Sequence, residues 1–562
     1  MKERIFIGVA WPYANGPLHL GHIAGAYLPA DIFARYHRLK GNEVLMVSGS
    51  DQHGAPILIR ADQESRSPQE LVSRYHQQFL DCWQKLGISF DLFTTTSTQN
   101  HAQVVHDIFL TLLDKGYLYK DRTLQAYCPK CQRFLPDRYL KGVCPYCGFS
   151  EARGDECDQC SRPLNSSELK DLHCVLCGTS PRFESSEHFF LRLSAFQDKL
   201  KEWAVAQSHW RKNVAGTTWK FLNEGLKDRA ITRDINWGVT VPQTGFEGKR
   251  IYVWFEAVIG YLSATKEWAK FHHEEQAWKP FWQGDAKSFY FVGKDNIFFH
   301  TIVWPVMLMG YGGLNLPYDV PANEFLTIEG RRLSTSRNWA VWLPDYLERY
   351  DADPLRYILS VNMPETGDSD FSWREFVRRA NNELVATYGN LVHRVLSFAY
   401  RNFDGAVPSP GDADSQSQTL LHEAETMLND VDGLLYHCRF KEAIREAMSL
   451  AQKTNRYLDN QAPWKTIEKD RQASARSIHT AILSLSALKT ALYPFLPFSS
   501  EKLHSLLGFE GSLSEIGWKF QLLAEGQKLR QPQPLFSKLD EDVVEQESSR
   551  LGSACDCEIN GA

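Results

Sequence analysis

The chain has 562 residues, too many for one ordinary core, and domains of about 100 to 200 residues predict three or four of them. Apolar residues make up 43% of the sequence and charged residues 23%, and no uninterrupted apolar run is long enough to span a bilayer, so we expect no membrane partner. The net charge of −6 means that any nucleic acid must bind to local basic surface, because the whole molecule does not attract phosphate at long range. The first residues lack the basic and apolar parts of a signal peptide, so we expect a cytoplasmic protein.

The N-terminal region has the pattern of an α/β domain. Residues 4–10 are predicted to form a buried strand, residues 19–39 a long helix, and residues 42–49 a second strand that ends at Ser50–Gly54. In an open parallel sheet, ligand groups gather beyond the carboxyl ends of the strands, so we expect a ligand site here.

The tetrapeptide His19-Leu20-Gly21-His22 lies where the first strand passes into the first helix. Free backbone N–H groups and the helix dipole favour phosphate at such a position, and Gly21 removes a side chain that would block close approach. His19 and His22 can donate hydrogen bonds to an α-phosphate that gains charge during in-line attack. Taken alone, this short pattern is equally compatible with a helix start that carries two surface imidazoles.

Residues 118–183 lose helical periodicity and carry four Cys-x-x-Cys pairs. Each pair can present two thiolates to one tetrahedral ion, so eight thiolates suit two Zn²⁺ ions, and the absence of any other ligand type indicates structural rather than catalytic sites. Redox use is the alternative, but no thioredoxin-like setting accompanies the pairs. The pairs are Cys128/Cys131, Cys144/Cys147, Cys157/Cys160 and Cys174/Cys177.

Beyond the cysteines, helical periodicity returns from about residue 186 to residue 229. Strand-like stretches at residues 250–254 and 288–293 are expected to lead the chain back to the first sheet, so the cysteine-rich segment reads as an insertion that splits the α/β domain.

From Asp370 to about Leu507 the sequence shows amphipathic periodicity with few glycines and no convincing strand, which predicts a separate helical bundle. After about Lys538 no apolar period is sustained, and this tail is expected to be disordered.

In their order along the chain, these motifs resemble those of the class I aminoacyl-tRNA synthetases. The His-x-Gly-His sequence after the first strand is the first signature of that class, and the segments 10–19 and 50–56 look like the methionyl-tRNA synthetase family in particular. The resemblance covers roughly residues 4–510. It implies a Rossmann-like parallel-sheet catalytic domain split by a zinc-knuckle insertion and followed by an all-α anticodon-binding bundle. The implied division is 1–117 and 232–322 for the two halves of the catalytic domain, 118–231 for the insertion, 323–380 for the signature-loop and stem-contact region, 381–538 for the anticodon-binding domain and 539–562 for the disordered tail.

The second class I signature, Lys-Met-Ser-Lys-Ser, aligns with Arg332-Leu333-Ser334-Thr335-Ser336 and departs from it. Arg332 can replace the first lysine as a cation, but Thr335 cannot supply the second positive charge. This departure implies weaker activation, compensation by neighbouring arginines, or a paralogue that has lost full activity.

The resemblance also implies which residues form the site. Aromatic stripes are usually core packing, and only the shared order of the motifs favours a pocket here. Methionine would be bound by Ala10, Trp11, Tyr13, Asp51, Trp254, Ala257, Tyr261 and His300, with Asp51 on the ammonium group and His300 against the thioether. ATP would be bound by His19, Gly21, His22, Asp295, Arg332 and Thr335, and catalysis would depend on His19, His22, Arg332, Ser334 and Ser336.

Two further sets of residues follow from the resemblance. In the family the cysteine pairing is nested, so that Cys144, Cys147, Cys157 and Cys160 would hold one Zn²⁺, and Cys128, Cys131, Cys174 and Cys177 the other. Asn390, Arg394 and Trp464 match the family's positions for reading the CAU anticodon, although without the family we would read them as helix surface and a packed tryptophan.

The implied reaction is the ATP-dependent activation of methionine to its adenylate, followed by transfer to the 3′ end of tRNA(Met), with Mg²⁺ accompanying ATP. Because the chain ends without the module that makes some members dimeric, a monomer is expected. A synthetase for leucine, isoleucine or valine would need a far larger editing insertion. A weakened paralogue would bind transfer RNA without forming adenylate, and a zinc-knuckle RNA-binding protein would leave the His19–His22 site unexplained.

Overall fold

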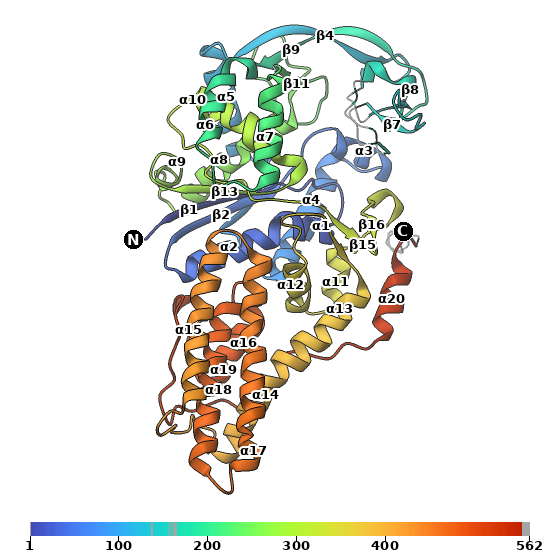
Figure 1. Cartoon of the computed structure of the whole chain (residues 1–562). Helices are drawn as coiled ribbons and strands as arrows, with labels where there is room; N and C mark the ends of the chain where they lie inside the picture. The colour runs from blue at the N-terminus through green and yellow to red at the C-terminus, as the bar shows by residue number, and fades with distance from the viewer. Residues whose placement is uncertain are drawn as a thin grey trace.

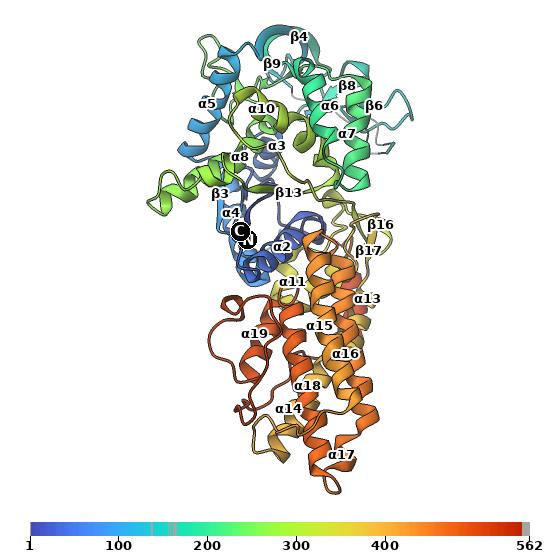
Figure 2. The same cartoon turned by 60° about the vertical axis from the view of Figure 1, so that its left-hand side comes forward.

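The computed structural model describes residues 2–135, 139–154, 157, 159–160, 164 and 166–553. An α/β part lies above an elongated group of helices that extends away from it (Figures 1 and 2). Within the described residues, no helix is both long enough and apolar enough to cross a membrane.

The centre of the α/β part is a five-stranded parallel sheet. Its order is β14-β13-β1-β2-β3, formed by Ala322–Asn323, Lys287–Gly293, Arg4–Val9, Glu43–Ser50 and Leu92–Thr95. The prediction of strands at residues 4–10, 42–49 and 288–293 is therefore confirmed. The chain adds strands first on one side of β1 and later on the other, and such a reversal opens a ligand crevice at the carboxyl ends of the central strands.

Helices cover both faces of this sheet. The predicted helix at residues 19–39 is one continuous helical segment made of α1 (Leu20–His22), the π-helical turn η1 (Ile23–Tyr27) and α2 (Leu28–Leu39). The other helices of this part are α3 (Ala55–Glu64), α4 (Pro68–Leu86), α5 (Gln99–Asp114), α8 (Val253–Phe271), α9 (Lys279–Trp282), the π-helical turn η6 (Phe299–Val303) and α10 (Trp304–Tyr311).

One strand expectation was wrong. Residues 250–254 do not join the central sheet: β12 (Arg250–Ile251) pairs with β11 (Thr232–Arg233), and α8 begins at Val253. Much of α8 is buried, so its apolar run reads like a buried strand. Periodicity alone does not separate the two cases over so short a stretch.

The insertion forms an arm at the top of Figure 1. Its long antiparallel pair consists of β4 (Leu118–Cys128) and β9 (Arg182–Leu191), so residues 186–191 are a strand and not the start of the expected helical stretch. β9 alternates buried and more exposed residues near Ser186–His188, and the helices begin only at Gln197. The smaller elements are β5 (Arg133–Phe134), β6 (Leu140–Val143), β7 (Ala152–Arg153), β8 (Lys170–Cys174), α6 (Gln197–Val205), α7 (Lys212–Glu224) and β10 (Arg229–Ala230).

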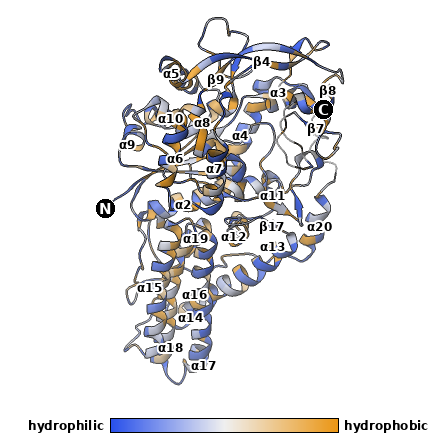
Figure 3. Ribbon diagram, turned by 45° about the horizontal axis from the view of Figure 1, so that its top comes forward, coloured by the Kyte–Doolittle hydropathy of each residue, from blue (hydrophilic) through white to orange (hydrophobic). Residues whose placement is uncertain are grey.

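After the sheet, a small three-stranded sheet leads into the helical region. It is formed by β15 (Leu326–Ile328), β16 (Arg331–Arg332) and β17 (Ser369–Phe371), and it is followed by the predicted helices. Their hydrophobic and hydrophilic residues alternate along the bundle in Figure 3, as the amphipathic pattern predicts. Two helices that were not predicted, α11 (Leu343–Arg349) and α12 (Ala352–Val361), lie between β16 and β17. The predicted bundle consists of α13 (Trp373–Arg379), η8 (Ala380–Gly389), α14 (Asn390–Asn402), α15 (Ser415–Tyr436), α16 (Phe440–Gln461), α17 (Pro463–Thr466), α18 (Arg471–Leu492) and α19 (Pro497–Leu506).

The tail after residue 538 contains a helix, so the prediction of disorder was wrong for its described part. α20 (Asp542–Arg550) carries Glu547, whose side chain is 3% exposed and accepts hydrogen bonds from Arg349 and Tyr350. A buried ion pair and a few apolar contacts fix this helix, and neither produces an apolar period in the sequence. Residues 554–562 lie outside the described part of the chain.

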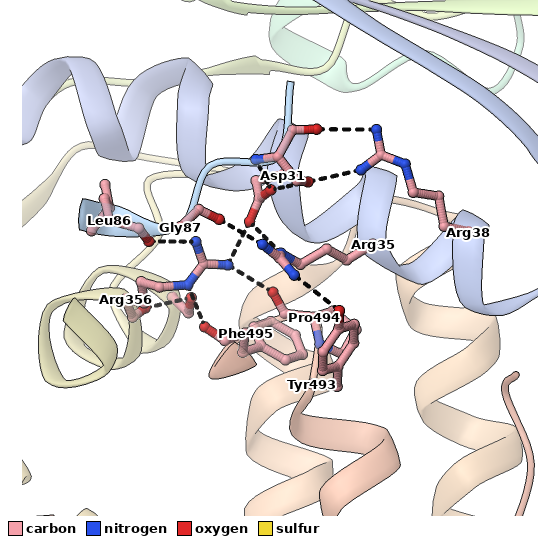
Figure 4. Close-up of polar contacts among 11 residues, drawn as sticks. Asp31, Arg35, Arg38, Leu86, Gly87, Arg356, Tyr493, Pro494 and Phe495 are labelled. Atoms are coloured by element: carbon pink, nitrogen blue, oxygen red, sulfur yellow. Dashed lines mark hydrogen bonds and ion pairs between the residues drawn. The ribbon is translucent and has the colours of Figure 1, made fainter. Parts of the chain in front are cut away.

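A buried polar network joins the α/β part to the helical region (Figure 4). Arg356 of α12 donates to Asp31 Oδ2 of α2 at 2.7 Å and to the carbonyl oxygens of Pro494 and Phe495 at 2.9 and 2.7 Å. Burial alone would raise the pKa of Asp31, but Arg35 and Arg356 hold it at about 2. Asp31 is therefore ionised and ties three parts of the chain together.

Candidate active site

A cavity of about 530 Å³ lies beyond the carboxyl ends of β1 and β13. The predicted residues of the methionine and ATP sites converge on it from segments that are far apart in the sequence. Those that line it are Ala10, Trp11, Tyr13, His19, Gly21, His22, Asp51, Trp254, Ala257, Tyr261, Asp295, His300 and Arg332. Ser334 and Thr335 do not line the cavity but follow Arg332 in the adjacent loop.

The two histidines of the first signature stack on each other at the start of the helix. Their ring centroids are 3.8 Å apart, and the backbone N–H of His19 donates to Nδ1 of His22 at 3.1 Å. Burial lowers the pKa of His22 to about 4 and lowers that of His19 well below its usual value. Both rings are therefore neutral near pH 7, and because Nδ1 of His22 accepts a hydrogen bond, its proton is on Nε2 and free to be donated.

Gly21 brings the two signatures into contact. A Cβ atom at this position would lie 2.5 Å from Cδ1 of Leu333 and 3.0 Å from the His19 ring, so a larger residue would displace the Leu333 side chain. His19 also forms an isolated antiparallel bridge with Trp342, and Leu20 N–H donates to the carbonyl oxygen of Val341 at 3.2 Å.

The inner wall of the cavity is aromatic and holds one neutral imidazole. The Tyr261 hydroxyl lies 2.8 Å from Nε2 of His300, and Nδ1 of His300 lies 2.9 Å from the carbonyl oxygen of Asn296. Burial lowers the pKa of His300 to about 4, so Nδ1–H donates to Asn296 and Nε2 accepts from Tyr261. Trp254 stacks on Phe299 with ring centroids 4.4 Å apart. Such surfaces suit a polarisable sulfur.

The position of the Trp11 ring requires glycine at two places in the chain, neither of which was singled out from the sequence. A Cβ atom at Gly49 would lie 2.2 Å from Cζ3 of Trp11, and one at Gly260 would lie 2.7 Å from Cε2. Gly49 is inside strand β2 and Gly260 is inside helix α8, and a glycine in either place marks the close approach of another group. That signal was available in the sequence.

Asp51 is 3% exposed and lies near a second buried carboxylate, Glu256. Burial, and then the negative charge of Glu256, raise the pKa of Asp51 well above its usual value. Glu256 is within hydrogen-bonding distance of Nδ1 of His53, at 2.9 Å, and of Nε2 of His101, at 3.2 Å. Glu256 and His101 were not predicted from the sequence, because the residues that they contact are distant in the chain. A cation beside Asp51 would relieve the unfavourable burial of its charge.

The residues 331–339, which we name the signature loop, form a closed hairpin. Ser334 and Trp339 exchange backbone hydrogen bonds of 3.0 and 2.9 Å, and the Arg331 guanidinium lies 4.7 Å from the centroid of the Trp339 ring. Thr335–Arg337 form a short 3-10 turn. The side chains of Arg332, Thr335 and Arg337 are exposed, so two arginines of the loop are accessible to an anion.

The eight cysteines form two separate groups of four, with the nested pairing that the resemblance implies. One group is Cys128, Cys131, Cys174 and Cys177, and the other is Cys144, Cys147, Cys157 and Cys160. The four sulfur–sulfur contacts within these groups measure 3.4, 4.0, 3.9 and 3.6 Å. Four thiolates at about 2.3 Å from one Zn²⁺ lie about 3.8 Å apart, so both groups fit a tetrahedral zinc ion.

At the far end of the helical bundle, two of the three predicted anticodon residues contact each other. The guanidinium of Arg394 lies 5.0 Å from the centroid of the Trp464 ring, and Trp464 is 38% exposed. Asn390 is exposed at the start of α14, one turn before Arg394. An exposed indole beside a guanidinium and an amide provides a stacking surface and hydrogen-bond donors for unpaired bases.

Comparisons with known proteins agree with this geometry. A model described as tRNA synthetases class I (M) matches residues 5–396, and one for the anticodon binding domain of methionyl tRNA ligase matches residues 407–556. The chain is 58% identical to a methionine–tRNA ligase of Dehalococcoides mccartyi, over 98% of this chain and 100% of the relative. It is 50% identical to that of Thermomicrobium roseum, over 98% and 99%.

Among solved structures, it is similar to the methionyl-tRNA synthetase of Mycobacterium tuberculosis in complex with methionyl-adenylate. The TM-score is 0.79 and the identity is 26%, with 95% of this chain and 99% of that chain covered. The chain therefore belongs to the methionyl-tRNA synthetases, the class I aminoacyl-tRNA synthetases that join methionine to its transfer RNA.

Proposed function

We propose that the cavity beyond β1 and β13 holds methionine and ATP side by side, with its lining residues in the roles that the family implies. The main support for this proposal is that the residues predicted to bind methionine and those predicted to bind ATP line the same cavity. In the family's reaction, a carboxylate oxygen of methionine attacks the α-phosphorus of ATP, and pyrophosphate leaves. The terminal ribose hydroxyl of tRNA(Met) then attacks the adenylate, and AMP leaves.

The ammonium group and the side chain of methionine are recognised by different residues. Asp51 accepts the ammonium group, whose charge offsets the repulsion from Glu256. The thioether lies against His300 and Tyr261, which bond to each other. The walls are Trp11, Tyr13 and Trp254 together with Ala10 and Ala257. The pocket therefore offers polarisable surface rather than an open hydrogen-bond donor for the side chain.

The α-phosphate is stabilised at the helix start. His19 and His22 direct their ring N–H groups to its oxygens, Gly21 allows close approach, and Asp295 binds the ribose. Arg332 balances the charge of the leaving pyrophosphate, and Ser334, Thr335 and Ser336 belong to the loop that presents it. Mg²⁺ enters with the phosphates of ATP and spreads their negative charge.

The other parts of the chain hold and read the transfer RNA. Two structural Zn²⁺ ions shape the insertion, residues 118–231, over the catalytic halves at 1–117 and 232–322. Residues 323–380 contact the stem, and the domain at 381–538 reads the CAU anticodon through Asn390, Arg394 and Trp464. We also propose that the protein acts as a monomer in the cytoplasm, which sedimentation and fractionation would test.

The test is amino-acid-dependent ATP–pyrophosphate exchange by the purified protein, with methionine compared with leucine, isoleucine, valine and cysteine. Exchange with methionine alone supports the assigned cavity and means that Thr335 is tolerated in the loop. No exchange from protein with both zinc ions bound would favour a paralogue that binds transfer RNA without charging it.

A further inference from the structure

The helix α20 is anchored beside α11, and Gly552 and Ser553, which follow it, contact the signature loop. The anchor of α20 is Glu547, which accepts two hydrogen bonds from Arg349, at 2.8 and 2.9 Å, and one from the Tyr350 hydroxyl, at 2.9 Å. This bidentate ion pair is buried on the Glu547 side, so it holds the helix in one orientation. The direction in which the chain leaves α20 is thereby fixed.

Asn338 is the residue of the signature loop that bonds to Gly552 and Ser553. Its carbonyl oxygen accepts the N–H of Gly552 at 3.0 Å, and its side-chain Nδ2 donates to the carbonyl oxygen of Ser553 at 2.7 Å. Asn338 has a φ of +49°, and Gly552 has a φ of +76°. Asparagine and glycine both tolerate the left-handed backbone region, so Asn338 and Gly552 can each adopt the conformation that this contact needs. Gly552 also lies beside the ring of Trp339.

The same asparagine reaches the first signature. Its Oδ1 accepts the indole N–H of Trp342 at 2.7 Å, and Trp342 forms the backbone bridge with His19. One amide side chain thus links the end of the chain to the segment that runs beside the helix start. Asn338 therefore contacts the tail and Trp342 directly, and it is connected to the first signature through Trp342.

We infer that Asn338 is a positioning residue for ATP, and that Gly552 and Ser553 hold the signature loop through it so that Arg332 stays at the cavity. The inference rests on the proposed role of the cavity. The family's signature has a lysine at the position of Thr335. This loop therefore has one positive charge fewer with which to bind the phosphates of ATP. A loop that is already held before ATP arrives loses less conformational entropy on binding, which compensates for the missing attraction.

The test compares a chain that ends at Leu551 with a matched control that ends at Ala554, in which the Ser553 acceptor is still a peptide carbonyl. Both retain α20 and its Glu547 anchor, but only the control retains the two contacts with Asn338. In ATP–pyrophosphate exchange, we expect the shorter chain to show a KM for ATP that is higher by about tenfold, because two hydrogen bonds are lost. Its KM for methionine should stay within about twofold of the control, and its thermal midpoint should match.

Two substitutions separate the contacts. Asn338→Gly keeps the left-handed backbone and the Gly552 bond but removes both side-chain bonds, so its KM for ATP should also rise. Asn338→Asp keeps the acceptor for Trp342, but it places a carboxylate oxygen against the Ser553 carbonyl and a negative charge in the loop, so its KM for ATP should rise at least as much as that of Asn338→Gly.

Equal KM values for ATP in the two truncated chains would overturn the inference. So would a rise of both KM values together with a lower thermal midpoint, because that pattern indicates general destabilisation. Hydrogen exchange of the Ser334 and Trp339 amides gives a readout without activity: faster exchange in the shorter chain supports the inference, and unchanged exchange contradicts it. If the full chain shows no methionine-dependent exchange, the proposed function fails, whereas hydrogen exchange still decides whether the tail holds the loop.

Discussion

Replacement of Arg356 by methionine tests the buried joint between the α/β part and the helical region (Figure 4). The side chains of Arg356 and Asp31 are both fully buried, and Arg356 donates four hydrogen bonds, to Asp31 and to the carbonyl oxygens of Leu86, Pro494 and Phe495. Breaking a buried ion pair from one side costs about 3 to 5 kcal/mol, because the partner charge stays buried. Arg35 still contacts Asp31, which favours the lower end of that range.

The assay is urea unfolding of the variant beside a matched control, Arg378→Met. Arg378 pairs with Glu375 on the surface and is 49% exposed, so its loss should cost less than about 1 kcal/mol. We also expect Arg356→Met to reduce aminoacylation of tRNA(Met) more than ATP–pyrophosphate exchange, because the joint fixes the position of the helical region relative to the α/β part. A variant as stable as Arg378→Met would refute the reasoning.

Three further changes have defined outcomes. Gly260→Ala places a methyl group 2.7 Å from the indole of Trp11, so the KM for methionine should rise at least about tenfold, and an unchanged KM would contradict the close contact. Cys144→Ser should reduce bound zinc from two ions to one by metal analysis, whereas Cys82→Ser, outside both groups, should retain two. Burial lowers the pKa of Lys489 to about 7, whereas its ordinary pKa is 10.5. Between these two pH values the unfolded chain binds more protons than the folded chain. The free energy of unfolding should therefore rise with pH in this range. Lys489→Met should flatten that slope in urea titrations at pH 7.5 and 9.5, and an identical slope would count against the assignment.

The parts of the fold that repeat a simple period could be predicted from the sequence. The strands at residues 4–10 and 42–49 have apolar centres, and the helix at residues 19–39 shows a clear period, so their places were confirmed. The stretch at residues 250–254 was wrongly placed in the central sheet: only Arg250–Ile251 form a strand, in a separate pair, and α8 begins at Val253. A buried helix start and a buried strand look alike over so few residues.

Features that depend on contacts between distant residues could not be predicted. α20 has a polar sequence, and what fixes it is the pairing of Glu547 with Arg349, far away in the chain. The same holds for Glu256, whose partners His53 and His101 lie on other segments. The cysteine pairing was predicted only through the resemblance, because spacing alone allows other combinations.

The most direct test of the central claim is the amount of methionyl-adenylate formed in a single turnover, compared between the unaltered protein and Asp51→Asn. We expect a burst of adenylate stoichiometric with the unaltered protein, and a large loss in Asp51→Asn at the same methionine concentration, because the buried amide cannot balance the charge of the ammonium group. Adenylate formation that is equal in the two proteins, or absent from both, would contradict the assignment of this cavity as the site of methionine activation.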